Sequence, residues 1–241
     1  MRSTRYTNLY PFLPKNGRQP DRSLFRTVLN SPYLSLYMQA NYSDSVFINC
    51  PFDSQYNPIF RAIVFTVYRC GFLPVCALDE DNGLENRLRK IEKQIQSCQY
   101  GIHDLSRAEQ NSPAFPRFNM PFELGIFWGA KRFGNQRQRG KNALIFDSDK
   151  YRYQQFISDL NGVDIKAHHN DPSVAVRTVR DWLKTSSRRT TIPGHNILIK
   201  EFRNFSENLP RICENLGLDV NDILFNDFCL IVEESLKKNL E

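Results

Sequence analysis

Residues 46–71 read VFINCPFDSQYNPIFRAIVFTVYRCG and contain a complete strand–loop–helix unit. The opening VFINC is a short, mostly apolar run with β-branched and aromatic side chains, which predicts a buried strand that stops at Pro51. Asn57 and Pro58 form a good helix start, and apolar residues then recur at helical spacing until Gly71. The stretch therefore predicts a strand that leads through a loop into a helix.

The same alternation continues along the chain. Short apolar runs predict further strands, and helical periodicity predicts helices between them. Pro74 in the second strand suggests an edge position, because proline cannot donate to a central ladder. The predicted strands are 72–78, 100–105, 143–147 and 163–168, and the predicted helices are 84–99, 120–133, 151–160 and 172–183. This alternation predicts an α/β fold with a parallel sheet covered on both faces.

Four parts are predicted along the chain: a disordered basic extension over 1–40, an α/β domain over 41–184, a linker over 185–195 and a small helical domain over 196–241. Five of the six net positive charges lie in residues 1–37. Nucleic acid is therefore expected to bind only through this extension, if at all. Its Arg and Ser content with little acid also leaves a transit-like role open.

The composition is that of a soluble globular protein, with 41% hydrophobic and 24% charged residues. No apolar run approaches the roughly 20 residues of a membrane span. Six cysteines without a CxxC pair lie among apolar residues, which predicts buried thiols in a reduced, cytoplasmic setting. Neither GxGxxG nor GxxxxGK[ST] is present, so a dehydrogenase-type dinucleotide fold and a P-loop are not supported and no cofactor is predicted.

Ligands of an open parallel sheet bind where the strands end, at the carboxyl edge. Asn49 and Asp53 would lie there and could either bind ligand hydroxyls or cap the loop. Arg107 and Arg117 would suit a phosphate or simply be solvated. The segments expected at this edge are 49–53, 77–83, 103–107 and 119–123.

A metal site is a weaker hypothesis for the same edge. His168, His169 and Asp171 lie close together in the sequence. Adjacent residues of an extended segment point to opposite faces, however, so no metal site is predicted.

Residues 120–130 contain a single charged residue, Glu123, among apolar residues and glycines. A helix here is expected to be buried on all sides, with Glu123 in its first turn. An acid in that turn gains about 0.3–1 kcal/mol from the helix dipole. Ile126 and Phe127 nevertheless place the carboxylate over an apolar stripe.

Gly125 and Gly129, four residues apart, are expected to let this helix approach the sheet closely. A carboxylate held there must be satisfied by a ligand, by backbone N–H groups or by a cavity open to water. Glu123 is therefore the leading candidate for a functional residue.

PFELGIFWGAK, residues 121–131, matches the ElGyAxaxgK pattern of the nucleoside deoxyribosyltransferase superfamily. With a PF-containing loop after the first strand and an aspartate that closes the third, the chain resembles this superfamily and its TIR-like relatives in bacterial defence systems. The resemblance covers about residues 45–150. It implies a flavodoxin-like, doubly wound α/β fold, to which the C-terminal residues would add a small helical appendage.

In the family that this chain resembles, the glutamate attacks or stabilises the anomeric carbon while an N-glycosidic bond is cleaved. The resemblance makes Glu123 the nucleophile or stabiliser, and makes Asp104 the strand-end acid that protonates or holds the base. Two carboxylates suit this reaction, as they do in glycosidases. The implied substrate-binding residues are Asn49, Pro51, Phe52, Asp53, Ser106, Arg107 and Asn119.

The resemblance thus predicts a hydrolase or transferase that cleaves or transfers the N-glycosidic bond of a nucleoside, a nucleotide or NAD, as a bacterial defence effector. The alternative is a non-catalytic nucleotide-binding sensor that signals to a partner. PRFN, residues 116–119, stands in place of the family's acidic DxG and keeps that alternative open. A third hypothesis is an interaction protein whose basic tail binds nucleic acid. A second copy of the chain or a partner protein remains open, and no membrane contact is expected.

Overall fold

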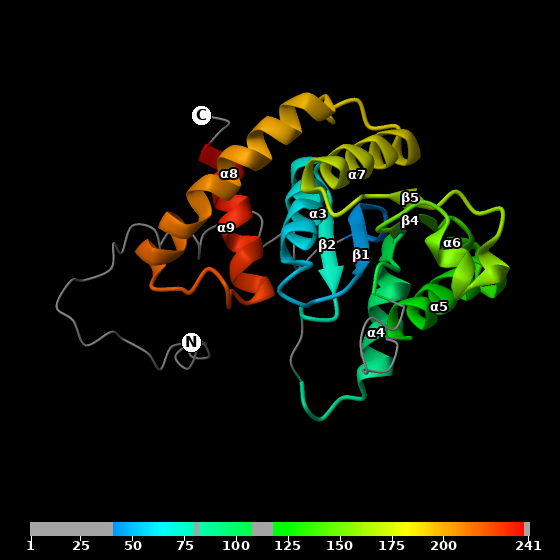
Figure 1. The fold of residues 1–241 in the computed structure, drawn as a ribbon. Coiled ribbons are helices and arrows are strands. Elements are labelled where there is room, and N and C mark those ends of the chain that lie inside the picture. Colours follow the sequence, from blue (N-terminus) through cyan, green and yellow to red (C-terminus); the bar gives the residue numbers. More distant parts are fainter. Residues whose placement is uncertain (1–40, 80–81, 108–117, 239–241) are drawn as a thin grey trace.

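A computed structural model of the protein describes residues 41–79, 82–107 and 118–238. At its centre is a five-stranded sheet with the strand order β2-β1-β3-β4-β5 (Figure 1). Every neighbouring pair in this sheet is parallel. This order is that of flavodoxin-like folds, with the switch point between β1 and β3. The predicted fold class is confirmed, and so is the edge position of the second strand.

The strands are short, and helices separate them along the chain. The strands are β1 Ser45–Asn49, β2 Leu73–Cys76, β3 Tyr100–Asp104, β4 Asn142–Asp147 and β5 Lys166–Ala167. The helices among the described residues are α3 Asn57–Arg69, α4 Arg87–Ser97, α5 Asn119–Phe133, α6 Gln136–Arg139, α7 Pro172–Ser187, α8 His195–Leu216 and α9 Phe225–Lys238. Pro58 occupies the first turn of α3, where the missing proline N–H costs nothing.

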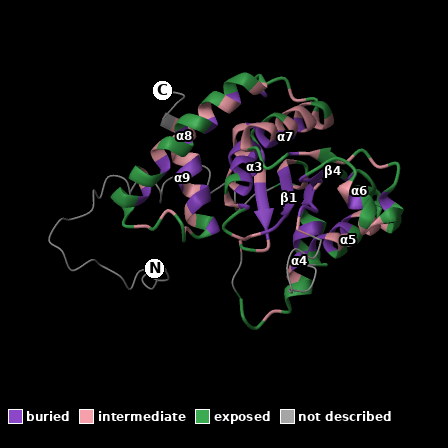
Figure 2. Ribbon diagram, viewed as in Figure 1, coloured by how far each residue is buried: buried purple, intermediate pink, exposed green. Residues whose placement is uncertain are grey.

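Side chains alternate between the two faces of the sheet and so define two cores. Ile48 and Ile102 point toward α3 and α7 and belong to the larger core cluster. Phe47, one residue before Ile48, packs on the other face with Ile91 of α4 and Phe127 of α5. The sheet is buried between these layers, as Figure 2 shows. The two-residue period of a strand therefore decides which helix layer each residue meets.

The C-terminal helices α8 and α9 extend the larger core. Phe202 and Phe205 of α8 and Phe228 of α9 belong to the same cluster as α3, and the Phe65 ring lies 5.2 Å from the Phe205 ring. Arg69 of α3 forms an ion pair with Glu201 of α8. The predicted helical appendage is thus present and packs against α3.

One predicted helix is wrong. Residues 151–160 form two short 3₁₀ turns, Arg152–Gln155 and Ser158–Leu160. Tyr151 has φ of 64° and lies in the left-handed region, which a right-handed helix cannot include. The apolar residues of this segment instead fold over α5, where Tyr153 and Leu160 share a small core with Leu124.

The predicted basic extension over 1–40, Glu80, Asp81 and Arg117 lie outside the described residues. All six cysteines are described; each is a buried free thiol, as predicted. Within the described ranges, none of the helices combines the length and apolar character that crossing a membrane requires.

Candidate functional site

Glu123 lies on the buried face of α5 and is 5% exposed. Because α5 begins at Asn119, Glu123 is in the second turn, so its expected place in the first turn was wrong. Arg87 Nη2 of α4 lies 4.0 Å from Glu123 Oε1, at the outer limit of an ion pair. Burial raises the pKa of Glu123 to about 7, and Arg87 offsets only part of that rise. The carboxyl therefore changes its charge near neutral pH.

The expectation that α5 is buried on all sides is wrong. Phe122 and Phe133 are 56% and 88% exposed, whereas Leu124 and Phe127 are buried. The helix thus has one buried face and one exposed apolar face. Glu123 lies on the buried face with Leu124 and Phe127, so its desolvation comes from α5 packing on the sheet.

The close approach between α5 and the sheet is made by a strand glycine. A Cβ atom at Gly125 or Gly129 would meet nothing within 4 Å, so the role expected for these two glycines was wrong. A Cβ at Gly101 of β3 would lie 2.8 Å from both the Phe127 ring and His103 Nε2. The missing side chain of Gly101 lets the Phe127 ring reach β3.

Asn49, at the end of β1, is buried and anchors the start of α5. Its Nδ2 donates to the Met120 carbonyl at 2.8 Å and lies 3.1 Å from His103 Nδ1. Because Nδ2 is the donor, His103 Nδ1 is the acceptor and the ring proton is on Nε2. Burial lowers the pKa of His103 to about 3, so the ring is neutral. The Phe127 ring stands 4.9 Å from the His103 ring.

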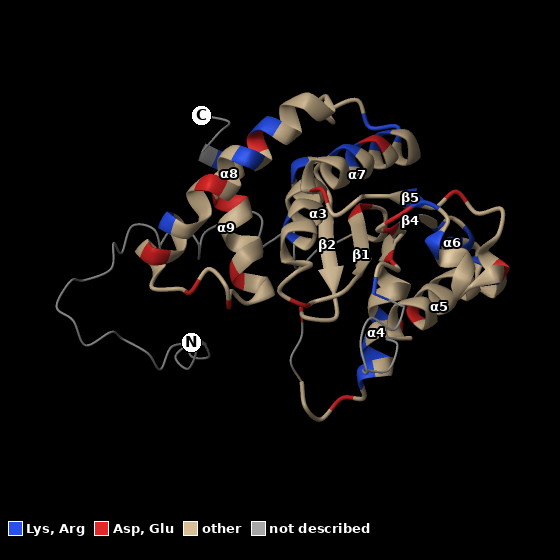
Figure 3. Ribbon diagram, viewed as in Figure 1, with Lys and Arg blue, Asp and Glu red and all other residues tan. Residues whose placement is uncertain are grey.

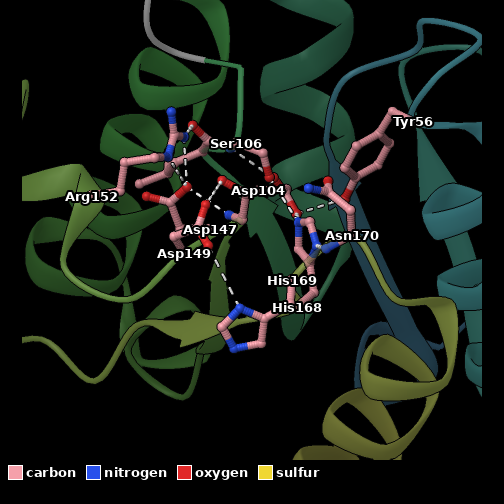
Figure 4. A network of polar contacts seen from close by, with 11 residues as sticks. Tyr56, Asp104, Ser106, Asp147, Asp149, Arg152, His168, His169 and Asn170 are labelled. Atoms are coloured by element: carbon pink, nitrogen blue, oxygen red, sulfur yellow. Dashed lines mark hydrogen bonds and ion pairs between the residues drawn. The ribbon is translucent and has the colours of Figure 1, made fainter.

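Asp104, at the end of β3, is fully buried in a network of hydrogen bonds (Figure 4). Tyr56 Oη donates to its Oδ2 at 2.6 Å, and His168 Nε2 lies 3.1 Å from the same oxygen. The Ser106 backbone N–H donates to Oδ1 at 2.8 Å, and the Ser106 hydroxyl donates to that oxygen as well. Burial by itself would raise the pKa of Asp104, but His168, Ser106 and Tyr56 together hold it below its ordinary value.

The turn after β5 determines which nitrogen of His168 carries its proton. The Asn170 N–H donates to His168 Nδ1 at 2.9 Å, so the proton of the neutral ring is on Nε2 and faces Asp104. His169 and Asn170 both adopt left-handed backbone conformations, with φ of 52° and 54°. Ser106 Oγ lies 2.8 Å from His168 Nε2, but its own proton points to Asp104. Ser106 is therefore not arranged as a nucleophile activated by histidine.

A second buried carboxylate ties β4 to β3 beside this network (Figure 4). Asp147 Oδ1 accepts from Arg152 Nε and from the Ser148 N–H, each at 2.7 Å. Arg152 Nη2 also donates to the Leu105 carbonyl at 2.8 Å. The carboxyl ends of β3, β4 and β5 are thus joined by side chains of this region.

The two predicted catalytic carboxylates lie on opposite sides of the sheet. Asp104 lies on the same face of β3 as Tyr100 and Ile102, which point toward α3 and α7. Its partners Tyr56 and His168 precede those two helices. Glu123 belongs to α5, which covers the other face. The structure thus brings Asp104 together with His168 and Ser106, and Glu123 together with Arg87.

The remaining predicted residues are divided between these regions. Asp53 Oδ1 accepts from the Tyr56 N–H at 3.1 Å, and Asp53 Oδ2 lies 3.6 Å from Arg107 Nε. Arg107 also donates to Gln55 at 2.9 Å, so it connects the loop after β3 to the loop after β1. The Phe52 ring stands 5.5 Å from the Phe60 ring of α3. Pro51 is buried and Asn119 is exposed at the start of α5.

Sequence reasoning missed Tyr56 and His168 as partners of Asp104. His168 follows the predicted fifth strand, so the strand-end rule could have gathered it to the same edge. The sequence pattern had drawn attention to it only as a metal ligand. Across the described parts of the chain, His, Cys, Asp and Glu side chains form no group of three or more placed to hold a metal ion.

Comparison with known proteins gives one partial match. The chain is 30% identical over 79 residues to the protein tirC of Dictyostelium discoideum, an alignment that covers 28% of this chain. It spans 38% of the length of tirC. No family model and no solved structure matches the chain significantly. The comparisons thus give a weak TIR-like likeness over part of the chain.

Proposed function

We propose that this protein cleaves or transfers the N-glycosidic bond of a nucleoside, a nucleotide or NAD, with Glu123 as the carboxylate that acts at the anomeric carbon. The observation that carries this proposal is a buried carboxyl with a pKa of about 7. It lies one turn after Met120, whose carbonyl is bonded to Asn49 at the switch point between β1 and β3. Ligands of flavodoxin-like sheets bind at that point. The partial match to tirC supports only the TIR-like part of the resemblance.

The chemistry needs a carboxylate that is poorly solvated. When the bond from the anomeric carbon to the base nitrogen breaks, its electron pair leaves with the base and positive charge develops on the sugar. An ionised Glu123 stabilises that charge more strongly in a desolvated site than in water. Water or another acceptor then attacks the anomeric carbon, and the proton of the attacking hydroxyl is released. Activity should therefore increase as Glu123 loses its proton.

The acid that would protonate the leaving base is the weaker part of the predicted pair. Asp104 accepts from Tyr56, His168 and Ser106, and its pKa is below its ordinary value. It is therefore a poor proton donor at neutral pH. A base that leaves as a neutral molecule from a cationic nucleotide, such as the nicotinamide of NAD, requires no proton donor. Among the three substrate classes, we favour this one because it needs no proton donor.

The non-catalytic sensor remains the second candidate function. Asp104 is held by hydrogen bonds and cannot serve as a proton donor, so a nucleotide whose base needs a proton to leave would be bound without being cleaved. Basic residues of α4, including Arg87, Arg89 and Lys90, lie on the helix beside Glu123 and would attract a phosphate (Figure 3). In that case the bound nucleotide would stay chemically unchanged.

The test is incubation of the full chain with nucleosides, nucleotides and NAD, followed by chromatography for free base. Glu123→Gln keeps the volume of the side chain and should lower base release by about 10²–10³-fold, as loss of a transition-state interaction does. Glu207→Gln, an exposed position on α8, is the matched control and should keep wild-type activity.

Two results would decide between the candidates. Release of base by the wild type but not by Glu123→Gln supports the enzyme. Stabilisation of the wild type by an intact nucleotide that stays unmodified supports the sensor. A full panel with neither turnover nor stabilisation would contradict both.

A further inference from the structure

A pocket lies beside the loop that follows β1. It has a volume of about 170 Å³ and lies where this loop and the loop after β2 meet the segment between α8 and α9. Figure 1 shows α9 beside α3 at this end of the sheet. Phe52, Phe60, Arg61, Asp222, Phe225 and Phe228 are among its lining residues. Neither Glu123 nor Asp104 contributes to it.

Aromatic rings form much of the wall. The Phe52 ring meets the Phe60 ring edge-on at 5.5 Å, and the Phe60 ring lies 5.9 Å from the Phe225 ring. Rings at such distances leave edges and faces on which a further ring can pack. A cavity of roughly 150 Å³ lined by apolar side chains is known to hold a benzene molecule. This pocket has a comparable volume, with Asn57, Asn221 and Asp222 also in its wall, and so has room for one aromatic ring.

Arg61 gives the same site a positive charge. Its Nη2 donates to the Val220 carbonyl, and its guanidinium lies 5.9 Å from the centre of the Phe228 ring. Among the described residues, no carboxylate lies within ion-pair distance of Arg61, although Asp222 also lines the site. The side chain is half-buried, so this cation is partly withdrawn from water without a counter-ion among the residues that the structure describes. Such a guanidinium favours a carboxylate or a phosphate, each of which can accept two parallel N–H bonds from it.

We propose that this pocket binds a small ligand that joins a single aromatic ring to a carboxylate or phosphate group. The ring would pack among Phe52, Phe60 and Phe228, and the anionic group would pair with Arg61. The proposal does not depend on the function proposed for Glu123. Because the lining comes from α3, the β1 loop and the segment before α9, occupancy would stabilise the packing of the C-terminal helices on the sheet.

The experiment measures binding to the full chain by calorimetry and by thermal shift. Benzoate and phenyl phosphate are the ring-bearing anions, benzyl alcohol is the neutral ring, and inorganic phosphate is the anion without a ring. The two ring-bearing anions should bind at least about tenfold more tightly than either of the other probes, as the loss of one charged contact would predict. They should also raise the melting temperature.

Two variants test the two halves of the site. Arg61→Met keeps the length and packing of the side chain and should weaken benzoate binding by about tenfold or more while benzyl alcohol binds as before. Ile223 also lines the pocket. Ile223→Trp places a large side chain there and should abolish binding of all ring-bearing probes. Arg203→Met, an exposed position on α8, is the control and should bind like the wild type.

Equal binding of benzoate and benzyl alcohol by the wild type would overturn the role of Arg61. If neither ring-bearing anion binds with a dissociation constant below about 10 mM, which corresponds to a binding free energy of about 3 kcal/mol, the site itself is overturned. If Arg61→Met does not fold, Ile223→Trp decides, because unchanged benzoate binding by that variant also contradicts the proposal.

Discussion

Asp104 and Glu123 are both buried carboxylates near the same end of the sheet, yet their surroundings have opposite effects. Asp104 receives hydrogen bonds from Tyr56, Ser106 and His168, and its pKa is lowered. Glu123 has Arg87 at 4.0 Å as its ion-pair partner among the described residues, and its pKa is raised to about 7. Burial penalises both charges, so the number of aligned donors decides the outcome. The two carboxylates thus differ in whether the fold supplies hydrogen-bond donors for the charged form.

The largest expected effect is on the Asp104 side. Asp104→Asn removes the charge and places an NH₂ group against the donors of Tyr56, Ser106 and His168. It should therefore lower the free energy of unfolding by about 3–5 kcal/mol. Urea unfolding measures this. Asp164→Asn, which touches an exposed ion pair with Lys166, should change stability by less than about 0.5 kcal/mol. If Asp104→Asn were as stable as that control, the network would not be structural and Asp104 would regain a role in catalysis.

Glu123→Gln should have the opposite effect on stability. The folded protein holds the Glu123 proton up to a pKa of about 7, whereas the ordinary value is 4.5. Wild-type stability should thus fall as pH rises from 4.5 to 7 and stay at the lower level above 7. The stabilisation of Glu123→Gln relative to wild type should grow over that window to at most about 3 kcal/mol. Urea unfolding at pH 4.5, 6 and 8 measures it; a difference independent of pH would show that burial does not perturb this carboxyl.

Asn49→Ala tests how Glu123 is held in place. The variant leaves the Met120 carbonyl and His103 Nδ1 without their shared donor and should cost about 1–3 kcal/mol of stability. Because Met120 is one turn before Glu123, base release should also fall if the protein is the proposed enzyme. Thermal unfolding and base release, measured on the same preparation, follow both effects. Asn204→Ala, an exposed change on α8, should alter neither stability nor base release. If Asn49→Ala behaved like Asn204→Ala in both measurements, Asn49 would have no role at the site.

Arg87→Met should give the smallest effect. Arg87 is largely exposed and lowers the pKa of Glu123 only in part. Its removal should raise that pKa further, by less than one unit, since exposed pairs are worth about 0–1 kcal/mol. Titration of the Glu123 side-chain carbon by NMR measures the shift, with Arg89→Met as the control. A pKa that falls in Arg87→Met would mean that another cation controls Glu123.

Much of the fold followed from local patterns. Helical spacing and a strand-loop-helix order predicted β1, α3, α5 and the parallel sheet, because each element buries one face and repeats its apolar residues at its own period. The turn region near Tyr151 was mispredicted as a helix. Its left-handed backbone is a response to packing over α5 that no local periodicity reports.

The candidate site was only partly predictable. Composition alone marked Glu123, because a single charged side chain in an apolar helix must find a ligand, a backbone donor or water. The pairing of Glu123 with Asp104 failed to account for strand alternation, since Asp104 points with Ile102 toward α3 and α7. The two-residue period of β3 is itself a property of the sequence, and it places Asp104 on the face of the sheet that α5 does not cover.

The sequence by itself determined an α/β chain with a parallel sheet, a proline-bearing edge strand and one out-of-place carboxylate on α5. Only the tertiary structure decided that Asp104 meets His168, which follows two further strands, β4 and β5, along the chain. It also decided that Gly101 rather than Gly125 permits the close contact with α5. The physical reason is that period and propensity act over a few residues. The donors around a buried charge, by contrast, come from segments that meet only when the strands have paired and the helices have covered them.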